Sequence, residues 1–244
     1  MNSVDGKRYR GLMNMRFPRI NNLMKAYFFL AFSFLISAVL FRFDPFLSAS
    51  AQSMISGQLE NIFDFISDAG LRLFYLIFAG LLIFALIKKN RHVRDLFLVY
   101  LKAELVFSFV VVRTLKFLFG RARPAYGSEF TFFSFNSHFN AFPSGHSADA
   151  AVAAAVLFFL LKDSPYKKWR FVPAVPAILV AGARFLCGAH HLSDVIAGCA
   201  IGVFGGFFFL SGLRERSAKA GDDLFPDSGR SPFFLILAGP ELIF

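Results

Sequence analysis

Long apolar stretches alternate with short basic segments along most of the chain. Six of these stretches approach the roughly 20 residues that a helix needs to cross a bilayer core. They lie at about residues 23–41, 71–87, 96–118, 146–161, 171–188 and 192–213. The pattern predicts an all-α fold, a polytopic membrane bundle of about six transmembrane helices.

The first apolar stretch has a second interpretation as a secretory signal peptide. Ala49-Ser50-Ala51 resembles a small-residue cleavage site. The stretch is longer than the apolar part of a usual signal, and Arg42 and Asp44 come before the small residues. These features favour a retained transmembrane helix over a cleaved signal.

Two shorter apolar segments are not predicted to span. Between the first two stretches, four apolar residues recur at helical spacing (Leu59, Ile62, Phe63 and Ile66). They predict an amphipathic helix, at about 52–68, that lies on the membrane surface. The segment 233–244 is apolar but contains Pro240 and Glu241, and it lies either on the surface or against the bundle.

Basic residues are distributed unevenly between the two sides of the predicted bundle. Of the 26 Lys and Arg residues, 18 fall in residues 1–25, the 88–94 and 162–170 loops and the C-terminal tail. The positive-inside rule therefore places both termini in the cytoplasm. The chain divides into a basic arm (1–22), a six-span membrane domain (23–213) with the amphipathic segment on its periplasmic side, and a cytoplasmic tail (214–244).

Composition narrows the function classes further. The 244 residues are 56% hydrophobic and include 36 Phe, more than a soluble domain of this size carries. The net charge of +10 follows the predicted topology, so we expect no nucleic-acid partner. Cys187 and Cys199 both lie in apolar stretches without zinc-ligand spacing. We therefore expect no metal and no cofactor.

A turn before the fourth stretch has the features of an anion site. Pro143-Ser144-Gly145-His146 runs directly into an Ala-rich helix. Gly145 has no side chain to block close approach, and a helix N-terminus offers unpaired N–H groups with partial positive charge. His146 can exchange a proton near neutral pH. The turn predicts the floor of a phosphate site.

The predicted topology brings further charged residues to the same membrane face. Lys116 and Arg123 follow the third stretch, and Arg184 lies near the end of the fifth. A lysine and two arginines beside a helix N-terminus suit a dianion, because guanidinium groups bind its oxygens in pairs. Arg113 and Arg121 are candidates to extend this basic pocket toward the substrate. His138, in the outer loop, is a weaker candidate for a substrate contact.

A second histidine completes a possible reaction centre. His190 and Asp194 are four residues apart, so on a helix they share a face. A carboxylate on one ring nitrogen fixes the tautomer and leaves the other nitrogen free to attack phosphorus. His146 is then the acid for the departing oxygen. The residues predict phosphoryl transfer through a phosphohistidine.

Other polar or small residues in the stretches favour structural roles. Lys102 and Glu104 lie within the third stretch, where charge is costly, and we expect each to find a partner inside the bundle. Gly198, Gly202, Gly205 and Gly206 predict close helix packing in the sixth stretch.

Three segments resemble the signature motifs of the type 2 phosphatidic acid phosphatase superfamily. They are Lys116-x6-Arg123-Pro124, Pro143-Ser144-Gly145-His146 and Arg184-x5-His190-x3-Asp194. The resemblance implies phosphate binding by Lys116, Arg123, Ser144, Gly145 and Arg184, with His146 as general acid, His190 as nucleophile and Asp194 as its orienting partner. The third motif of the family usually begins Ser-Arg, whereas this chain has Ala183-Arg184. One hydroxyl contact, worth about 1 kcal/mol, is then missing.

The substrate is inferred from the bacterial members of this family. The length, the layout and the Phe142–Ser147 segment are most similar to the lipid A phosphatases, with the 1-position favoured over the 4′-position. This implies a lipid phosphate substrate, an inner-membrane location and a site that faces the periplasm. Phosphatidylglycerophosphate and undecaprenyl pyrophosphate are alternative substrates. An anion or lipid transporter is the alternative outside the enzymes, although the chain shows no internal repeat. The oligomeric state stays open.

Overall fold

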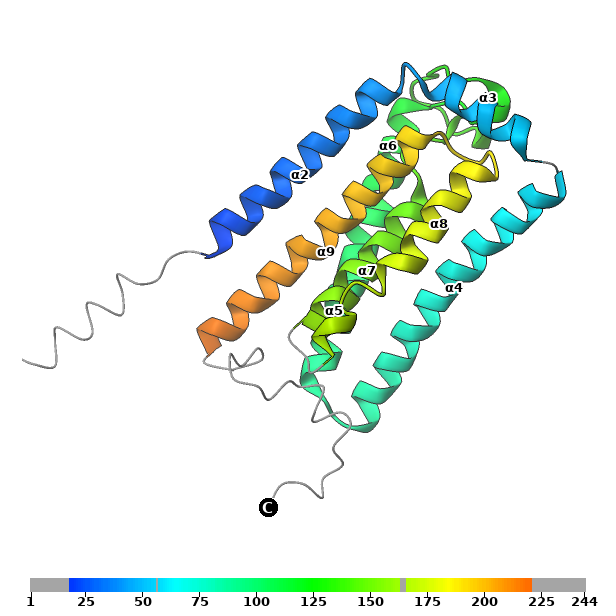
Figure 1. Cartoon of the computed structure of the whole chain (residues 1–244). Coiled ribbons are helices and arrows are strands. Elements are labelled where there is room, and N and C mark those ends of the chain that lie inside the picture. Colours follow the sequence, from blue (N-terminus) through cyan, green and yellow to red (C-terminus); the bar gives the residue numbers. More distant parts are fainter. Residues whose placement is uncertain (1–17, 56, 163–165, 221–244) are drawn as a thin grey trace, which may run out of the picture.

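The computed structural model describes residues 18–55, 57–162 and 166–220, and all regular secondary structure in this part of the chain is helical (Figure 1). The all-α class is therefore confirmed. The basic arm up to residue 17 and the 233–244 segment lie outside the described residues. The helices are α2 (Pro18–Leu40), α3 (Asp44–Met54), α4 (Gly57–Ile87), α5 (Arg91–Ala103), α6 (Val112–Phe119), α7 (Gly145–Lys162), α8 (Ala174–Leu186) and α9 (Leu192–Ala220). A π-helical segment, η1 (Glu104–Val111), joins α5 to α6, and 3-10 turns cover Pro124–Tyr126, Ser137–Phe139 and Lys167–Trp169.

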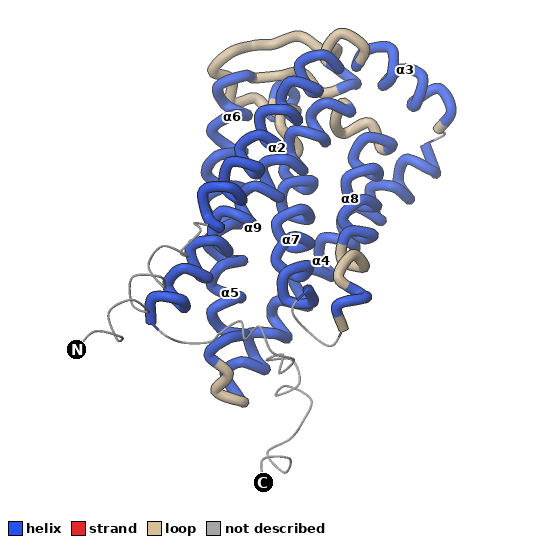
Figure 2. Tube along the Cα trace, turned by 60° about the vertical axis from the view of Figure 1, so that its left-hand side comes forward, coloured by secondary structure: helices blue, strands red, loops and turns tan. Residues whose placement is uncertain are grey.

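Helix α7 lies at the centre of the bundle, between α8, α9 and the α5–η1–α6 run (Figure 2). Its alanines leave room for neighbouring backbones. A Cβ on Gly198 would lie 2.3 Å from the carbonyl oxygen of Ser144, and one on Gly202 would lie 2.2 Å from that of Ala148. Gly205 and Gly206 are equally crowded by side chains. The predicted close packing of these four glycines is confirmed.

Candidate membrane spans can be compared directly with the predicted stretches. Four helices in the described residues are long and apolar enough to cross a membrane, at 57–87, 145–162, 167–186 and 192–213. The pair α2 and α3, bent by 74°, would make a fifth if the two helices form one broken span. The remaining predicted stretch, 96–118, lies in the α5–η1–α6 run, where the helix type changes twice. The start of α2 and the end of α9 lie at the same end of the bundle (Figure 1). The count of six spans stays a prediction.

The amphipathic surface helix predicted at about 52–68 is not a separate element. Residues 57–68 form the first turns of α4, which continues without a break to Ile87. No proline interrupts this helix. Gly70 does not end it either: the glycine allows α8 to approach closely, because a Cβ there would lie 2.6 Å from Cγ2 of Val180. The part of α4 from Gly57 to Gly70, called its outer part because it lies far from the start of α2 and the end of α9 (Figure 1), is therefore held beside α8, close to the connection that carries His190.

Candidate active site

The predicted motifs meet at one end of the bundle, where the 120–144 and 187–191 connections lie beside the start of α7 (Figure 1). Two hydrogen bonds tie the second motif to the third. Nδ1 of His190 donates to the carbonyl oxygen of Ala141 at 2.7 Å, and the amide of Ser144 donates to the carbonyl oxygen of Asp194 at 2.9 Å. Segments about 50 residues apart in sequence are thereby fixed against each other.

His190 lies in the short connection before α9, with only 3% of its surface exposed. A carbonyl oxygen can only accept, so Nδ1 carries the hydrogen in the bond to Ala141, and Nε2 of the neutral ring keeps its lone pair. Burial lowers the pKa of His190 to about 3, and the charges of Lys116 and Arg184 act in the same direction against the opposing effect of Asp194. The ring is neutral at physiological pH, as a nitrogen nucleophile must be.

Asp194 does not orient His190 by a direct hydrogen bond. Its Oδ2 lies 3.8 Å from Nδ1 of His190, beyond hydrogen-bond distance. The carboxylate instead accepts the backbone N–H of His191 at 2.8 Å and Nη1 of Arg121 at 2.6 Å. Asp194 is the third residue of α9, so it caps the helix by reaching back to the residue before it. The predicted orienting role passes to the carbonyl of Ala141.

Arg121 is not available to extend a substrate pocket. Its side chain is buried and pairs with Asp194 and, at 2.8 Å, with Asp44 of α3. Its guanidinium carbon also lies 4.5 Å from the ring centroid of Phe41. Ser193 joins the same network through Asp44. The expected substrate contact of Arg121 is therefore corrected to a structural one that ties α3 to the start of α9.

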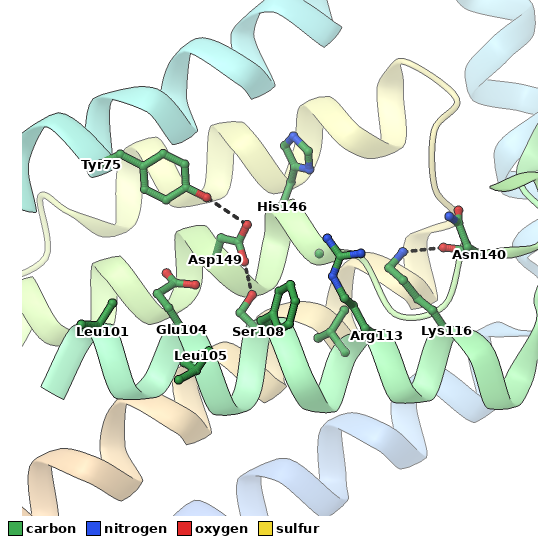
Figure 3. A pocket seen from close by; sticks show the side chains of 13 residues that line it. Tyr75, Leu101, Glu104, Leu105, Ser108, Arg113, Lys116, Asn140, His146 and Asp149 are labelled. Carbon is green, nitrogen blue, oxygen red and sulfur yellow. Dashed lines mark hydrogen bonds between the residues drawn. The ribbon is translucent and has the colours of Figure 1, made fainter. Parts of the chain in front are cut away.

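Asn140 joins two of the predicted phosphate-binding cations. Its backbone carbonyl accepts from Nζ of Lys116 (Figure 3). Its side-chain oxygen accepts from Nε and Nη2 of Arg123 at 3.2 and 3.0 Å. No sequence pattern indicates Asn140, which lies three residues before Pro143. Asn140 therefore holds two positively charged side chains close together, and such a pair binds a dianion favourably.

The third cation, Arg184, is paired with a residue that no sequence motif indicated. Its Nη1 lies 2.7 Å from Oδ1 of Asp64, on the outer part of α4. The side chain is 10% exposed, and its buried Nε has no partner among the described residues. A buried donor without a partner is costly, which fits a group that awaits a ligand.

The Ser144–His146 turn begins α7 as predicted. Ser144 is fully buried, and its Oγ accepts from Ser147 at 2.9 Å. A Cβ on Gly145 would meet no atom within 4 Å, so the backbone there faces open space. Nε2 of His146 lies 3.2 Å from Oδ1 of Asp68, also on α4. The sequence does not indicate Asp64 and Asp68 as site residues, because its apolar pattern predicts a surface helix for this part of α4.

Two cavities adjoin these residues. The larger, of about 570 Å³, is lined by Gly145 among others. Lys116 lies at one end of it and a polar group of Tyr75, Glu104, Ser108 and Asp149 at the other, with His146 between them (Figure 3). Arg113 also lines this cavity, and its contact with a substrate stays a prediction. Glu104, expected inside the bundle, faces Asp149 there (Figure 3). The smaller cavity, of about 310 Å³, is lined by Arg123, Arg184 and Asp64 among others.

One predicted substrate contact, His138, lines neither cavity. It is exposed and packs, with ring centroids 4.1 Å apart, on Tyr126, which lines the smaller cavity. Within the described residues, no group of three or more His, Cys, Asp or Glu side chains is placed to hold a metal ion.

The sequence is similar to a protein family and to several known proteins. The profile of the PAP2 superfamily matches residues 96–217, half of the chain. A lipid A 1-phosphatase of Rhizobium etli is 37% identical over 116 residues, 46% of this chain and 47% of that protein. A phosphatidylglycerophosphatase B of Bacillus subtilis is 38% identical over 81 residues, 31% of this chain and 39% of that protein. The chain thus matches less than half the length of these curated relatives.

A solved structure extends the similarity over most of the fold. The crystal structure of a transmembrane PAP2-type phosphatidylglycerolphosphate phosphatase from Bacillus subtilis superposes with a TM-score of 0.57 at 25% identity. The superposition covers 79% of this chain and 96% of that protein.

Proposed function

The chain belongs to the PAP2 superfamily, and from this membership we propose that it is a lipid phosphatase of a bacterial inner membrane that works without a metal. One observation carries the proposal: a buried, neutral His190 lies at the same end of the bundle as Lys116, Arg123 and Arg184. The hydrogen bonds through Asn140, Ala141 and Ser144 hold the three motifs together there. Cations around a nitrogen nucleophile suit attack on a phosphate dianion.

The reaction divides into two steps. Nε2 of His190 attacks phosphorus, the bond to the lipid oxygen breaks, and His146 gives that oxygen a proton. The lipid alcohol leaves and phosphate stays on His190. Water then attacks the phosphorus while the neutral His146 takes its proton, the N–P bond breaks, and inorganic phosphate is released. Lys116, Arg123 and Arg184 stabilise the charge on the phosphoryl oxygens throughout.

An amphiphilic substrate is supported by the larger cavity. Leu101, Leu105 and Phe109 line it beside Lys116 and His146. A phosphate beside Lys116 and His146 and lipid chains along the apolar wall would match this distribution. We favour the 1-phosphate of lipid A, because the Rhizobium relative carries that name. Removing it would lower the negative charge of the outer surface and weaken the binding of cationic antimicrobial peptides.

The test is phosphate release by the purified, detergent-solubilised protein in the presence of EDTA. The substrates are lipid A, phosphatidylglycerophosphate and undecaprenyl pyrophosphate, with His190→Ala as the control. We expect release from lipid A that is lost in the variant, and mass spectrometry of the product to locate the missing phosphate. Release from another lipid alone would replace the substrate but keep the chemistry. No release from any of the three would favour the transporter alternative.

The proposed orientation of the protein in the membrane, with the site facing the periplasm, is tested separately. Phe135, in the 120–144 connection, is 90% exposed, and Lys88 lies exposed at the opposite end of the bundle. In a background without Cys187 and Cys199, we expect a membrane-impermeant maleimide to label Phe135→Cys in intact cells with a permeabilised outer membrane. Lys88→Cys should react only after lysis. The reverse pattern would place the site in the cytoplasm.

A further inference from the structure

The outer part of α4 presents two carboxylates, one helical turn apart, to two residues of the proposed reaction centre. Asp64 pairs with Arg184 at 2.7 Å, and Asp68 pairs with His146 at 3.2 Å. Positions i and i+4 lie on the same face of a helix, so one face of α4 serves both contacts. Neither residue belongs to the three motifs.

The contact with Asp68 constrains a ring that is otherwise free to turn. His146 is the second residue of α7, and its side chain keeps 34% of its surface exposed. The last torsion of a histidine has broad minima, so an exposed ring needs a partner to stay in one orientation. The other oxygen of Asp68 lies 3.3 Å from Arg72, but both side chains of this pair are largely exposed, so the pair adds little to the position of the carboxylate. The backbone of α4 therefore sets where Asp68 lies, and its carboxylate faces Nε2 of His146.

We propose that Asp68 is a positioning residue for the acid His146, an inference that rests on the proposed phosphatase function. The carboxylate holds Nε2–H and leaves Nδ1 to pass the proton. A negative charge beside the ring also stabilises the imidazolium, the only form that can give a proton to the lipid oxygen. In a phosphohistidine mechanism this contact sets both the direction of the ring and its supply of protons.

The proton balance follows from this arrangement. In the first step the Nδ1 proton moves to the lipid oxygen as the P–O bond breaks and its electron pair stays on oxygen. The ring is then neutral, with its remaining hydrogen on Nε2 facing Asp68. In the second step Nδ1 accepts a proton from the attacking water, which restores the imidazolium. Asp68 stays ionised through both steps.

The test compares Asp68→Asn with Arg72→Gln on two substrates. The asparagine still accepts from Nε2–H but has lost the charge. We expect kcat on the preferred lipid to fall about 10- to 100-fold with KM nearly unchanged, a part of the 10²- to 10⁴-fold contribution of a general acid. On 4-nitrophenyl phosphate, whose leaving group departs as a stable anion, kcat should change less than threefold. The basic limb of the pH profile on the lipid should move to lower pH. Arg72→Gln removes only the surface pair on α4, so it should match the wild type.

Three results would overturn this role for Asp68. They are an Asp68→Asn variant as active as the wild type on the lipid, an equal loss on both substrates, or the same loss in Arg72→Gln. Thermal unfolding of both variants separates misfolding from a catalytic effect, and Asp68→Glu, which restores the charge, should recover part of the lipid activity. These results are distinct from failure of the proposed function, in which the wild type itself releases no phosphate from any lipid.

Discussion

His190 donates its Nδ1 hydrogen to the carbonyl oxygen of Ala141 across 2.7 Å. A backbone group therefore sets the tautomer of the proposed nucleophile. Asp194, the residue that the motif spacing suggested for this task, lies 3.8 Å from the same nitrogen and is engaged with Arg121 and the start of α9. The carboxylate contributes charge near the ring and stability to the helix, and the carbonyl contributes the orientation.

This division predicts different effects for two substitutions. His190→Ala should abolish turnover. Asp194→Asn should retain turnover at least 100-fold above His190→Ala, because Ala141 still holds the ring. It should lower thermal stability, because Arg121 is left buried beside a weaker partner. Steady-state kinetics and thermal unfolding check both. An Asp194→Asn protein with wild-type stability and no turnover would restore the direct orienting role.

Substitution of Arg121 should mainly lower stability, whereas substitution of Arg123 should mainly lower activity. Arg121→Ala leaves Asp44 and Asp194 as uncompensated buried charges, so we expect a loss of about 3–5 kcal/mol of stability. Arg123→Ala removes a half-buried cation held by one asparagine, so the fold should persist while kcat/KM falls by about 100-fold. Denaturant unfolding and kinetics of the two variants decide. Equal stability of both variants would contradict the network assigned to Arg121.

Glycines of α9 offer a matched pair for the packing of the site. A Cβ on Gly198 would press on the carbonyl of Ser144, whereas one on Gly212 would meet no atom within 4 Å. Gly198→Ala should cost about 1–3 kcal/mol and lower activity, because Ser144 and His146 begin the helix that would be pushed away. Gly212→Ala should be neutral or slightly stabilising. Activity and stability of Gly198→Ala equal to those of Gly212→Ala would show that α7 and α9 are farther apart.

The buried histidine predicts a pH dependence of stability. Its pKa is about 3 in the folded chain and about 6.5 when unfolded, so the unfolded state binds more protons below pH 6.5. The stability is full above pH 6.5 and is lost as the pH falls toward 3, by about 2 kcal/mol at pH 5. His190→Asn keeps a side-chain N–H for Ala141 but cannot be protonated in this range, so its loss between pH 7.5 and pH 5 should be smaller by that amount. If the free energy of unfolding falls equally with pH in the wild type and in His190→Asn, a buried neutral His190 is contradicted.

Much of the site was predictable because its charged residues and histidines lie in three short sequence motifs. The order Lys116, Arg123, His146, Arg184, His190 indicated one phosphate centre, and the alternation of apolar stretches indicated that the segments meet at one membrane face. The helix that begins at Gly145 and the glycine contacts of α9 followed from local rules for turns and close packing.

The partners of these residues were not predictable by the same means. Asp44 pairs with Arg121 across 77 positions, and Asp64 pairs with Arg184 across 120. Nothing in the spacing of single charges indicates such pairs, because they depend on how α3 and α4 pack. Four apolar residues from Leu59 to Ile66 have the period of a surface helix, and that period is equally compatible with the first turns of a longer one. Gly70 did not mark a break because it meets Val180 of α8.

The central claim is that phosphate passes through His190. The direct measurement is to mix the wild type with a lipid substrate labelled in its phosphate, quench within milliseconds in alkali, which spares an N–P bond, and identify the labelled peptide by mass spectrometry. We predict phosphate on His190, none in His190→Ala, and a longer-lived adduct in His146→Ala, which lacks the base for the second step. Phosphate release at the wild-type rate with no labelled histidine, or with label on another residue, would contradict the account.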